Sequence, residues 1–297
     1  MSNKSLTIRR IVIFCVLAFL PVAIMVLLMN LYYGELIFVS EKATVGIYLS
    51  GMLGMMFPAA ANLLTRLITK EGMGNNLLAL NFKGHGRWYA ASVLAPLGEV
   101  AVAAVLLCTI YLNGMSFGEI FPADGLSDKT AILLFQIEYS MIVFFPAFGE
   151  EWGWRGYLMP KLSEVMGKPA AVVVGGVIWG LWHAPLTISG HNFGVDYPGY
   201  PFVGILLMCV LCIADNAFLT LLTEKTGSIY PASFFHMLNN NCSMLVFLSI
   251  FGSPQAVEAA NGIPTVQAFL TIMLPPTVLL GAGSFILLLK KRKPDAC

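Results

Sequence analysis

The chain has 297 residues and a formal net charge of +1, with 58% hydrophobic and only 11% charged residues. A soluble domain carries about 25% charged residues, so most of this chain cannot face water. The near-neutral charge also speaks against nucleic-acid binding, which needs a concentrated basic surface. The composition therefore predicts a multi-pass integral membrane protein with the lipid bilayer as its surroundings.

Eight apolar runs long enough to cross a bilayer follow one another along the chain. They cover residues 11–33, 45–64, 89–112, 131–148, 170–188, 202–222, 232–251 and 266–289. The first run is longer than a signal-peptide core of about 7 to 15 residues, which predicts a retained transmembrane helix. Neither a fixed-period repeat nor a long polar linker divides the chain. We therefore predict an all-α protein with eight transmembrane helices in a single membrane domain, residues 1–297.

Basic residues predict the orientation of these spans, because cytoplasmic loops keep Lys and Arg while translocated loops lack them. With the N-terminus inside, 15 of the 17 basic residues fall in inner segments. They are Lys4, Arg9, Arg10, Arg66, Lys70, Lys83, Arg87, Arg155, Lys161, Lys168, Lys225, Lys290, Lys291, Arg292 and Lys293. Lys42 and Lys129 are the two exceptions. Both termini are therefore predicted to be cytoplasmic.

Three polar clusters occur in or next to the predicted spans, although an ionisable group in a bilayer costs about 2.5 to 3.5 kcal/mol on insertion scales. The first has the sequence Glu-Glu-Trp-Gly-Trp-Arg at residues 150–155. Positions four apart share a helix face, so Glu151 is predicted to pair with Arg155, leaving Glu150 unpaired. Residues 150–168 mix aromatic and charged side chains, which predicts an interfacial continuation of the fourth span. Taken alone, this cluster is typical of a capped transmembrane helix.

The other two clusters contain histidines at helical spacing. One runs from Trp179 to His183, and the other has His236 with Asn240 one turn further along. Each histidine alone is typical of a hydrogen-bonded core residue. Together, carboxylate, imidazole and carboxamide groups can activate a water and stabilise an oxyanion, as amide hydrolysis requires. Glu150, His183 and His236 equally suit a catalytic zinc ion with an open position for water.

The three motifs resemble those of the CPBP family of intramembrane metalloproteases, which includes CAAX prenyl endopeptidases and bacteriocin-processing and immunity relatives. The family pattern is Glu-Glu-x-x-x-Arg, then Phe-x-x-x-His, then His-x-x-x-Asn or Asp, on successive core helices. The matching residues here are Glu150, Glu151, Arg155, Trp179, His183, His236 and Asn240. The resemblance covers about residues 131–251, the predicted catalytic core. Trp179 departs from the family's phenylalanine, which predicts a narrower pocket.

The resemblance implies an endopeptidase that cleaves a membrane-associated peptide or protein near the cytoplasmic face, in a bacterial cell membrane. It implies that Glu150 activates the attacking water with help from His183. His236 and Asn240 would then hold the developing oxyanion. The remaining motif residues, Glu151, Arg155 and Trp179, are implied to be supporting groups. If zinc takes part, Glu150, His183 and His236 are its implied ligands, and no other cofactor is expected.

One geometric conflict accompanies this interpretation. His183 lies 13 residues beyond Ala170, or about 20 Å along a helix, whereas Glu150 is expected near the inner surface. The two side chains must meet for the mechanism to hold. We therefore expect the fifth helix to start in the cytosol or to tilt strongly.

Two other classes of protein fit parts of the sequence. A non-catalytic immunity or partner-binding protein would keep the motif residues as a polar core. A transporter would use intramembrane acids such as Glu99 and Asp215 as proton relays, but the polar motifs crowd into spans four to seven without an evident inverted repeat. Glu99, Glu138 and Asp215 are expected in structural hydrogen bonds, with Asp215 at a depth suited to orienting His236. His191 is expected to be solvated in a loop.

Overall fold

The computed structural model describes residues 3–241 and 244–290, and these residues form helices joined by loops, without a strand. The helices are α1 (Asn3–Tyr33), α2 (Thr44–Gly54), α3 (Phe57–Ile68), α4 (Gly86–Ile110), α5 (Phe117–Ile120), α6 (Leu126–Gly153), α7 (Met159–Met166), α8 (Lys168–Trp182), α9 (Ala184–Ile188), α10 (Phe202–Thr226), α11 (Tyr230–Asn241), α12 (Met244–Phe251), α13 (Pro254–Asn261), α14 (Thr265–Ala268) and α15 (Leu274–Leu289). A 3₁₀ turn covers Ile37–Val39, and π-helical turns cover Trp154–Leu158 and Phe269–Met273. The predicted all-α class is confirmed.

Within the described residues, seven helical segments are long and apolar enough to cross a bilayer. They are Asn3–Tyr33, Thr44–Ile68, Gly86–Ile110, Ser127–Met166, Lys168–Ile188, Phe202–Thr226 and Thr265–Leu289. Each overlaps one of the predicted runs. The predicted run 232–251 is instead formed by α11 and α12, which meet at 65° on either side of residues 242–243, outside the described residues. The count is therefore seven spans, or eight if this bent pair crosses as one.

The fourth span is the longest, at 40 residues, because α6 continues through a π-helical turn into α7. This confirms the helical continuation predicted for residues 150–168. A π-helical turn is rare and occurs frequently at functional sites. Here it begins at Trp154, three residues after Glu151, and includes Arg155.

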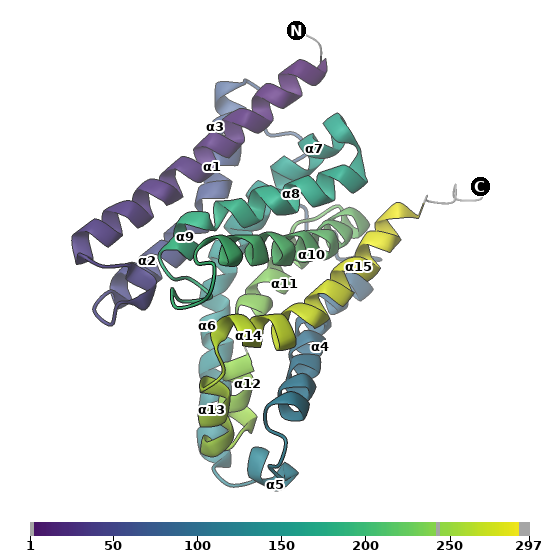
Figure 1. Ribbon diagram of the computed structural model, residues 1–297. Coiled ribbons are helices and arrows are strands. Elements are labelled where there is room, and N and C mark those ends of the chain that lie inside the picture. The colour runs from purple at the N-terminus through teal and green to yellow at the C-terminus, as the bar shows by residue number, and fades with distance from the viewer. Residues whose placement is uncertain (1–2, 242–243, 291–297) are drawn as a thin grey trace.

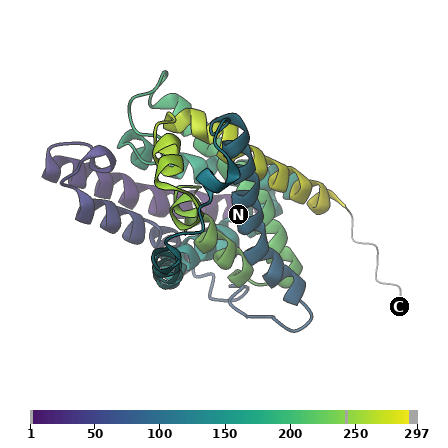
Figure 2. The ribbon, with the colours of Figure 1, turned by 90° about the horizontal axis from the view of Figure 1, so that it is seen from below.

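Helices α8 and α10 lie at the centre of the molecule. Figures 1 and 2 show α1 and α2 on one side of the molecule and α4 with α15 on the other, with α8 and α10 between them. Helix α10 packs against α8 on one side and α15 on the other, while α11 packs against α4 and α6. Helices α8, α10 and α11 therefore form the inner part of the bundle, and α6 joins them through its last turn, where Glu150 and Glu151 are buried.

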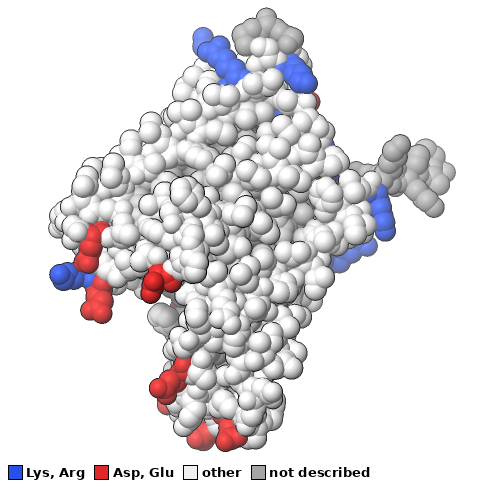
Figure 3. Space-filling view, viewed as in Figure 1, with Lys and Arg blue, Asp and Glu red and all other residues white. Residues whose placement is uncertain are grey.

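Charged side chains lie at the ends of the bundle in the view of Figure 3. Lys and Arg gather towards the upper and right-hand ends, where Figure 1 places the two termini. Asp and Glu gather at the lower and left-hand ends, together with one basic group. This separation agrees with the basic-residue pattern that predicts cytoplasmic termini, which stays a prediction. The basic residues Lys291, Arg292 and Lys293 lie outside the described residues.

Glycines allow α8 and α10 to pack with their backbones in contact. A Cβ atom on Gly176 or Gly180 would collide with the backbone of Ile213 or Cys209 on α10. This small-x-x-x-small spacing is a common device for close helix packing in membranes. It draws the end of α8, which carries Trp179 and His183, against α10.

A second glycine pair fixes the position of α6. A Cβ on Gly149 would meet Met56, and one on Gly153 would collide with Pro58. Both contacts lie at the start of α3, and the two glycines bracket Glu150 and Glu151 in the sequence. The polar cluster of α6 is thus held at a defined height beside α3.

We predict that Gly176→Val lowers the thermal unfolding temperature of the detergent-solubilised protein, because the added side chain must push α8 away from α10. Overpacking of this kind costs about 1 to 3 kcal/mol. The control is Gly283→Val on α15, where a Cβ has nothing within 4 Å. Equal unfolding temperatures for the two variants would contradict the described α8–α10 contact.

Candidate active site

A cavity of about 880 Å³ lies among the inner helices. Its walls come from α2, α6, α8, α10, α11, α12 and the segment leading into α15. Five of the motif residues line it, namely Glu150, Trp179, His183, His236 and Asn240. Glu150 and His183 therefore border the same cavity, Glu150 from α6 and His183 from the end of α8.

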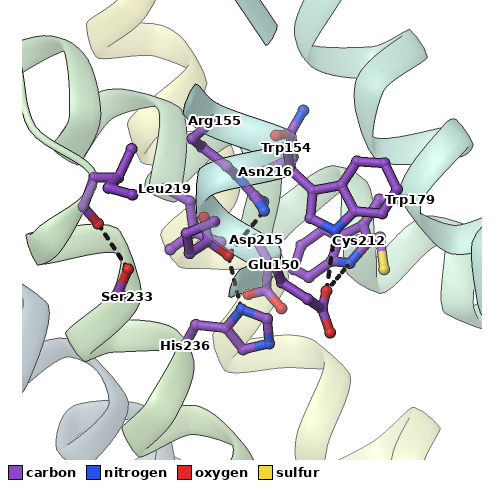
Figure 4. A network of polar contacts seen from close by, with 12 residues as sticks. Glu150, Trp154, Arg155, Trp179, Cys212, Asp215, Asn216, Leu219, Ser233 and His236 are labelled. Atoms are coloured by element: carbon purple, nitrogen blue, oxygen red, sulfur yellow. Dashed lines mark hydrogen bonds and ion pairs between the residues drawn. The ribbon is translucent and has the colours of Figure 1, made fainter. Parts of the chain in front are cut away.

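Glu150 is buried, and its carboxylate is held by two tryptophans. Its Oε2 atom accepts hydrogen bonds from the indole nitrogens of Trp154 at 3.0 Å and Trp179 at 2.8 Å. Figure 4 shows both bonds converging on the same oxygen. Trp154 lies four residues after Glu150, on the same helical face, whereas Trp179 comes from α8. The unpaired acid expected from the sequence therefore has two donors, both neutral.

Trp154 is a site residue that the sequence motifs do not single out. Its position four residues after Glu150 is the signal that could have found it, since an indole donor at that spacing can reach the carboxylate. The phenylalanine of the family pattern could not donate in place of Trp179. The departure at Trp179 therefore supplies a hydrogen bond in addition to an aromatic wall.

The predicted pair between Glu151 and Arg155 is confirmed. Their Oε1 and Nη1 atoms are 3.0 Å apart, and the side chains are 0% and 1% exposed. The Arg155 guanidinium also lies 4.2 Å from the centre of the Trp179 ring, within cation–π distance. Trp179 thus links the two acids. Its indole nitrogen donates to Glu150, and its ring face contacts Arg155, which pairs with Glu151.

His236 is oriented by Glu151. Its Nδ1 atom lies 2.7 Å from Oε1 of Glu151, so this nitrogen donates to the carboxylate and Nε2 is left for other contacts. The Trp179 ring packs edge-on against the imidazole, with centroids 5.5 Å apart. The sequence suggested Asp215 for the orienting role, and the structure gives the hydrogen bond to Glu151 instead.

His183 caps the end of α8. Its Nδ1 atom donates to the Trp179 carbonyl at 2.9 Å, which again leaves Nε2 without this bond. The imidazole of His191 stacks on that of His183 with centroids 6.5 Å apart. The expectation that His191 is solvated was wrong, because it lines the cavity and its Nδ1 atom is buried. Burial, aided by His183, lowers the pKa of this loop residue to about 3, so His191 is neutral at physiological pH.

The remaining polar residues differ in their surroundings. Asn240 faces the cavity and has no hydrogen bond to another described residue. Glu138 is exposed on the side of α6. Glu99 lies against the Thr277 side chain, although neither of its buried oxygens has a hydrogen bond of ordinary geometry among the described residues. Asp215 has a single long contact, described further below.

The zinc hypothesis requires Glu150, His183 and His236 to converge on one ion. Both imidazoles donate from Nδ1 to an oxygen, as metal-bound histidines commonly do. However, no three His, Cys, Asp or Glu side chains of the described residues come together closely enough to hold a metal ion. The described arrangement therefore does not fit a three-ligand zinc centre.

Comparisons with known proteins point to the same family as the motifs. Residues 132–242 match the family model of type II CAAX prenyl endopeptidases, Rce1-like. The chain is also 29% identical over 156 residues to CAAX prenyl protease 2 of Methanococcus maripaludis, covering 50% of this chain and 54% of that protein. The chain thus spans about half the length of the curated relative that it matches. Both matches confirm the resemblance to the CPBP family.

We predict that Arg155→Met destabilises the protein strongly, because Glu151 would lose the guanidinium that it pairs with in a buried site. Breaking such a pair costs about 3 to 5 kcal/mol. The matched control is Lys168→Met, whose partner Glu224 lies 2.7 Å away but at the surface. Exposed pairs contribute about 0 to 1 kcal/mol. Thermal unfolding in detergent measures both changes, and similar small shifts would contradict the buried network.

Proposed function

We propose that this chain is an intramembrane endopeptidase that hydrolyses a peptide bond by direct attack of water. The observation that supports this most is the Glu150 carboxylate. It sits in a cavity with His183, His236 and Asn240, and its two donors both occupy Oε2. Its other oxygen, Oε1, is left to accept a hydrogen bond from a water molecule.

Glu150 is proposed as the general base. A water bound to Oε1 loses a proton to the carboxylate as its oxygen attacks the carbonyl carbon of the substrate. The free Nε2 of neutral His183 accepts the second hydrogen bond of that water and orients it. After the tetrahedral intermediate forms, the C–N bond breaks. The departing nitrogen takes its proton from the carboxylic acid of Glu150, which restores the carboxylate.

His236 and Asn240 are proposed to stabilise the oxyanion. Asn240 lies one turn after His236 on α11, so the two side chains reach the same side of the helix. The Asn240 carboxamide donates from Nδ2, and His236 donates from Nε2 when that nitrogen carries a proton. Glu151 supports this by accepting from Nδ1 and fixing the ring, and Arg155 balances the charge of Glu151. Fixed donors of this kind are worth about 10²- to 10³-fold in rate.

The substrate is proposed to be a membrane-associated peptide or protein, cut near the cytoplasmic face. Most of the residues that line the cavity are apolar, which suits an apolar segment arriving from the lipid. The relative from Methanococcus maripaludis is named for prenylated CAAX tails, so a lipid-modified tail is one candidate class. A bacterial cell membrane is the proposed location.

Zinc stays an alternative source of the activated water. The side chains that would have to hold it are Glu150, His183 and His236, which would first have to move closer together. Metal content of the purified active protein, with its sensitivity to chelators, separates this route from catalysis by Glu150 alone.

A second candidate function is non-catalytic immunity or partner binding. It is favoured by one observation: Glu150 is held by two indole donors and Glu151 pairs with Arg155, as buried groups of a polar core would be. In that case, protection or partner binding would not depend on the basicity of residue 150.

We predict that Glu150→Gln abolishes cleavage while the protein stays folded. Glutamine keeps an oxygen for the two indole donors but cannot accept the proton, and loss of a general base costs about 10²- to 10⁴-fold in rate. The measurement compares peptides released in cells that express either form. Glu138→Gln, at the exposed side of α6, is the control for the same chemical change. Unchanged cleavage by the Glu150 variant would refute the assignment.

We also predict that Trp179→Phe lowers kcat about tenfold while KM changes little, because one donor that positions Glu150 is lost and the aromatic wall is kept. A hydrogen bond to a charged group is worth about 1.5 to 3 kcal/mol. Trp88→Phe on α4, outside the cavity, is the matched control. A rise in KM with kcat unchanged would show that Trp179 only shapes the pocket.

A further inference from the structure

Asp215 is a second acid in the wall of the cavity. It lies on α10, is 5% exposed, and lines the cavity together with Glu150 and His236. Its Oδ2 atom has one long contact, 3.5 Å from Nδ2 of Asn239. Its Oδ1 atom is buried and has no hydrogen-bond donor among the described residues. A carboxyl group in this state is costly unless a ligand supplies the missing donor.

Glu99 is a further acid close to Asp215, outside the residues that line the cavity. It comes from α4, and its carboxyl group lies against the Thr277 side chain of α15. Two acids from separate helices therefore lie near each other, with Thr277 beside one and the long contact from Asn239 on the other.

Neither Lys nor Arg lines the cavity within the described residues, where the acidic lining residues are Glu150 and Asp215. Two groups that can carry a positive charge, His236 and Arg155, lie within electrostatic reach of Asp215. Glu151 holds both of them. Figure 4 draws these groups together. The Asp215 carboxyl group is thus left without a Lys or Arg partner among the described residues, and it borders the space that a substrate would enter.

From this arrangement we infer that Asp215 binds a basic side chain of the substrate, Lys or Arg, a few residues from the bond that is cut. The inference rests on the proposed peptidase function and names its substrate class: an apolar membrane segment with a nearby positive charge. The long apolar stem of such a residue packs on the cavity walls while its charged end reaches the acid. Asp215 is a specificity-determining residue in this account.

The same charges disfavour a free carboxyl terminus close to the cut. A CAAX tail ends three residues after its cysteine. Its carboxylate would enter a cavity that carries two acids and, among the described lining residues, no Lys or Arg. The cavity therefore suits an internal segment or an amidated end better than a free acid.

The test uses synthetic apolar peptides that differ at one position, Lys or Gln, placed at successive sites along the chain. Binding is measured to the purified Glu150→Gln variant, so that it does not depend on hydrolysis. We expect the Lys peptide to bind about 10- to 100-fold more tightly, as one charge-assisted hydrogen bond allows. Adding Asp215→Asn should remove that difference, and adding Glu138→Gln should keep it. A short peptide with an amidated end should bind more tightly than its free acid.

Three results would overturn the inference. The first is equal binding of the Lys and Gln peptides at every position. The second is an Asp215→Asn variant that binds the Lys and the Gln peptide more weakly by the same factor, while its unfolding temperature is unchanged. The third is an effect of Asp215→Asn on peptide binding that is seen in sodium buffer and disappears in choline buffer. That result would assign Asp215 to a small inorganic cation. Cleavage by the wild-type protein is scored separately, so failure of the peptidase proposal is distinguishable from failure of this one.

Discussion

The hydrogen bonds from two indole nitrogens to one oxygen of Glu150 are the contact on which the rest of the site depends. A carboxylate buried among helices needs hydrogen-bond donors. Neutral donors such as indole N–H groups leave its negative charge available for chemistry, whereas an arginine would neutralise that charge. Trp154 arises from the helix that carries Glu150, and Trp179 crosses from α8. Because the Trp179 ring also receives the Arg155 guanidinium, one side chain ties the two acids of α6 to the second motif. The third motif joins through the bond from His236 to Glu151.

Backbone packing makes this arrangement possible. The glycines of α8 bring that helix into contact with α10, and the glycines that bracket the α6 acids seat that helix on α3. Neither set touches the polar groups, yet each fixes a helix that carries them. The cavity that results combines apolar walls with acids on two sides, Glu150 from α6 and Asp215 from α10.

The sequence predicts much of this fold because each transmembrane helix requires a long apolar run. Pairs of side chains within one helix are predicted by their spacing of three or four residues. The Glu151–Arg155 pair follows from such spacing, and so does the continuation of the fourth span. The bond from Trp179 to Glu150 and the cavity position of His191 depend on how helices and loops meet, which no local pattern records. The bend between α11 and α12 also depends on tertiary packing, and the pattern of apolar residues in the predicted run 232–251 does not indicate it. Asp215 lies within electrostatic reach of His236, but the hydrogen bond that orients this imidazole goes to Glu151.

The central claim is that a water molecule held by Glu150 attacks the peptide bond directly. A single turnover in ¹⁸O-labelled water, followed by mass spectrometry of the product and of the protein, tests it most directly. The account predicts one ¹⁸O atom in the new carboxyl terminus and none in the peptide that contains Glu150. Unlabelled product together with label in that peptide would contradict it, because the carboxylate itself would then have formed a covalent intermediate.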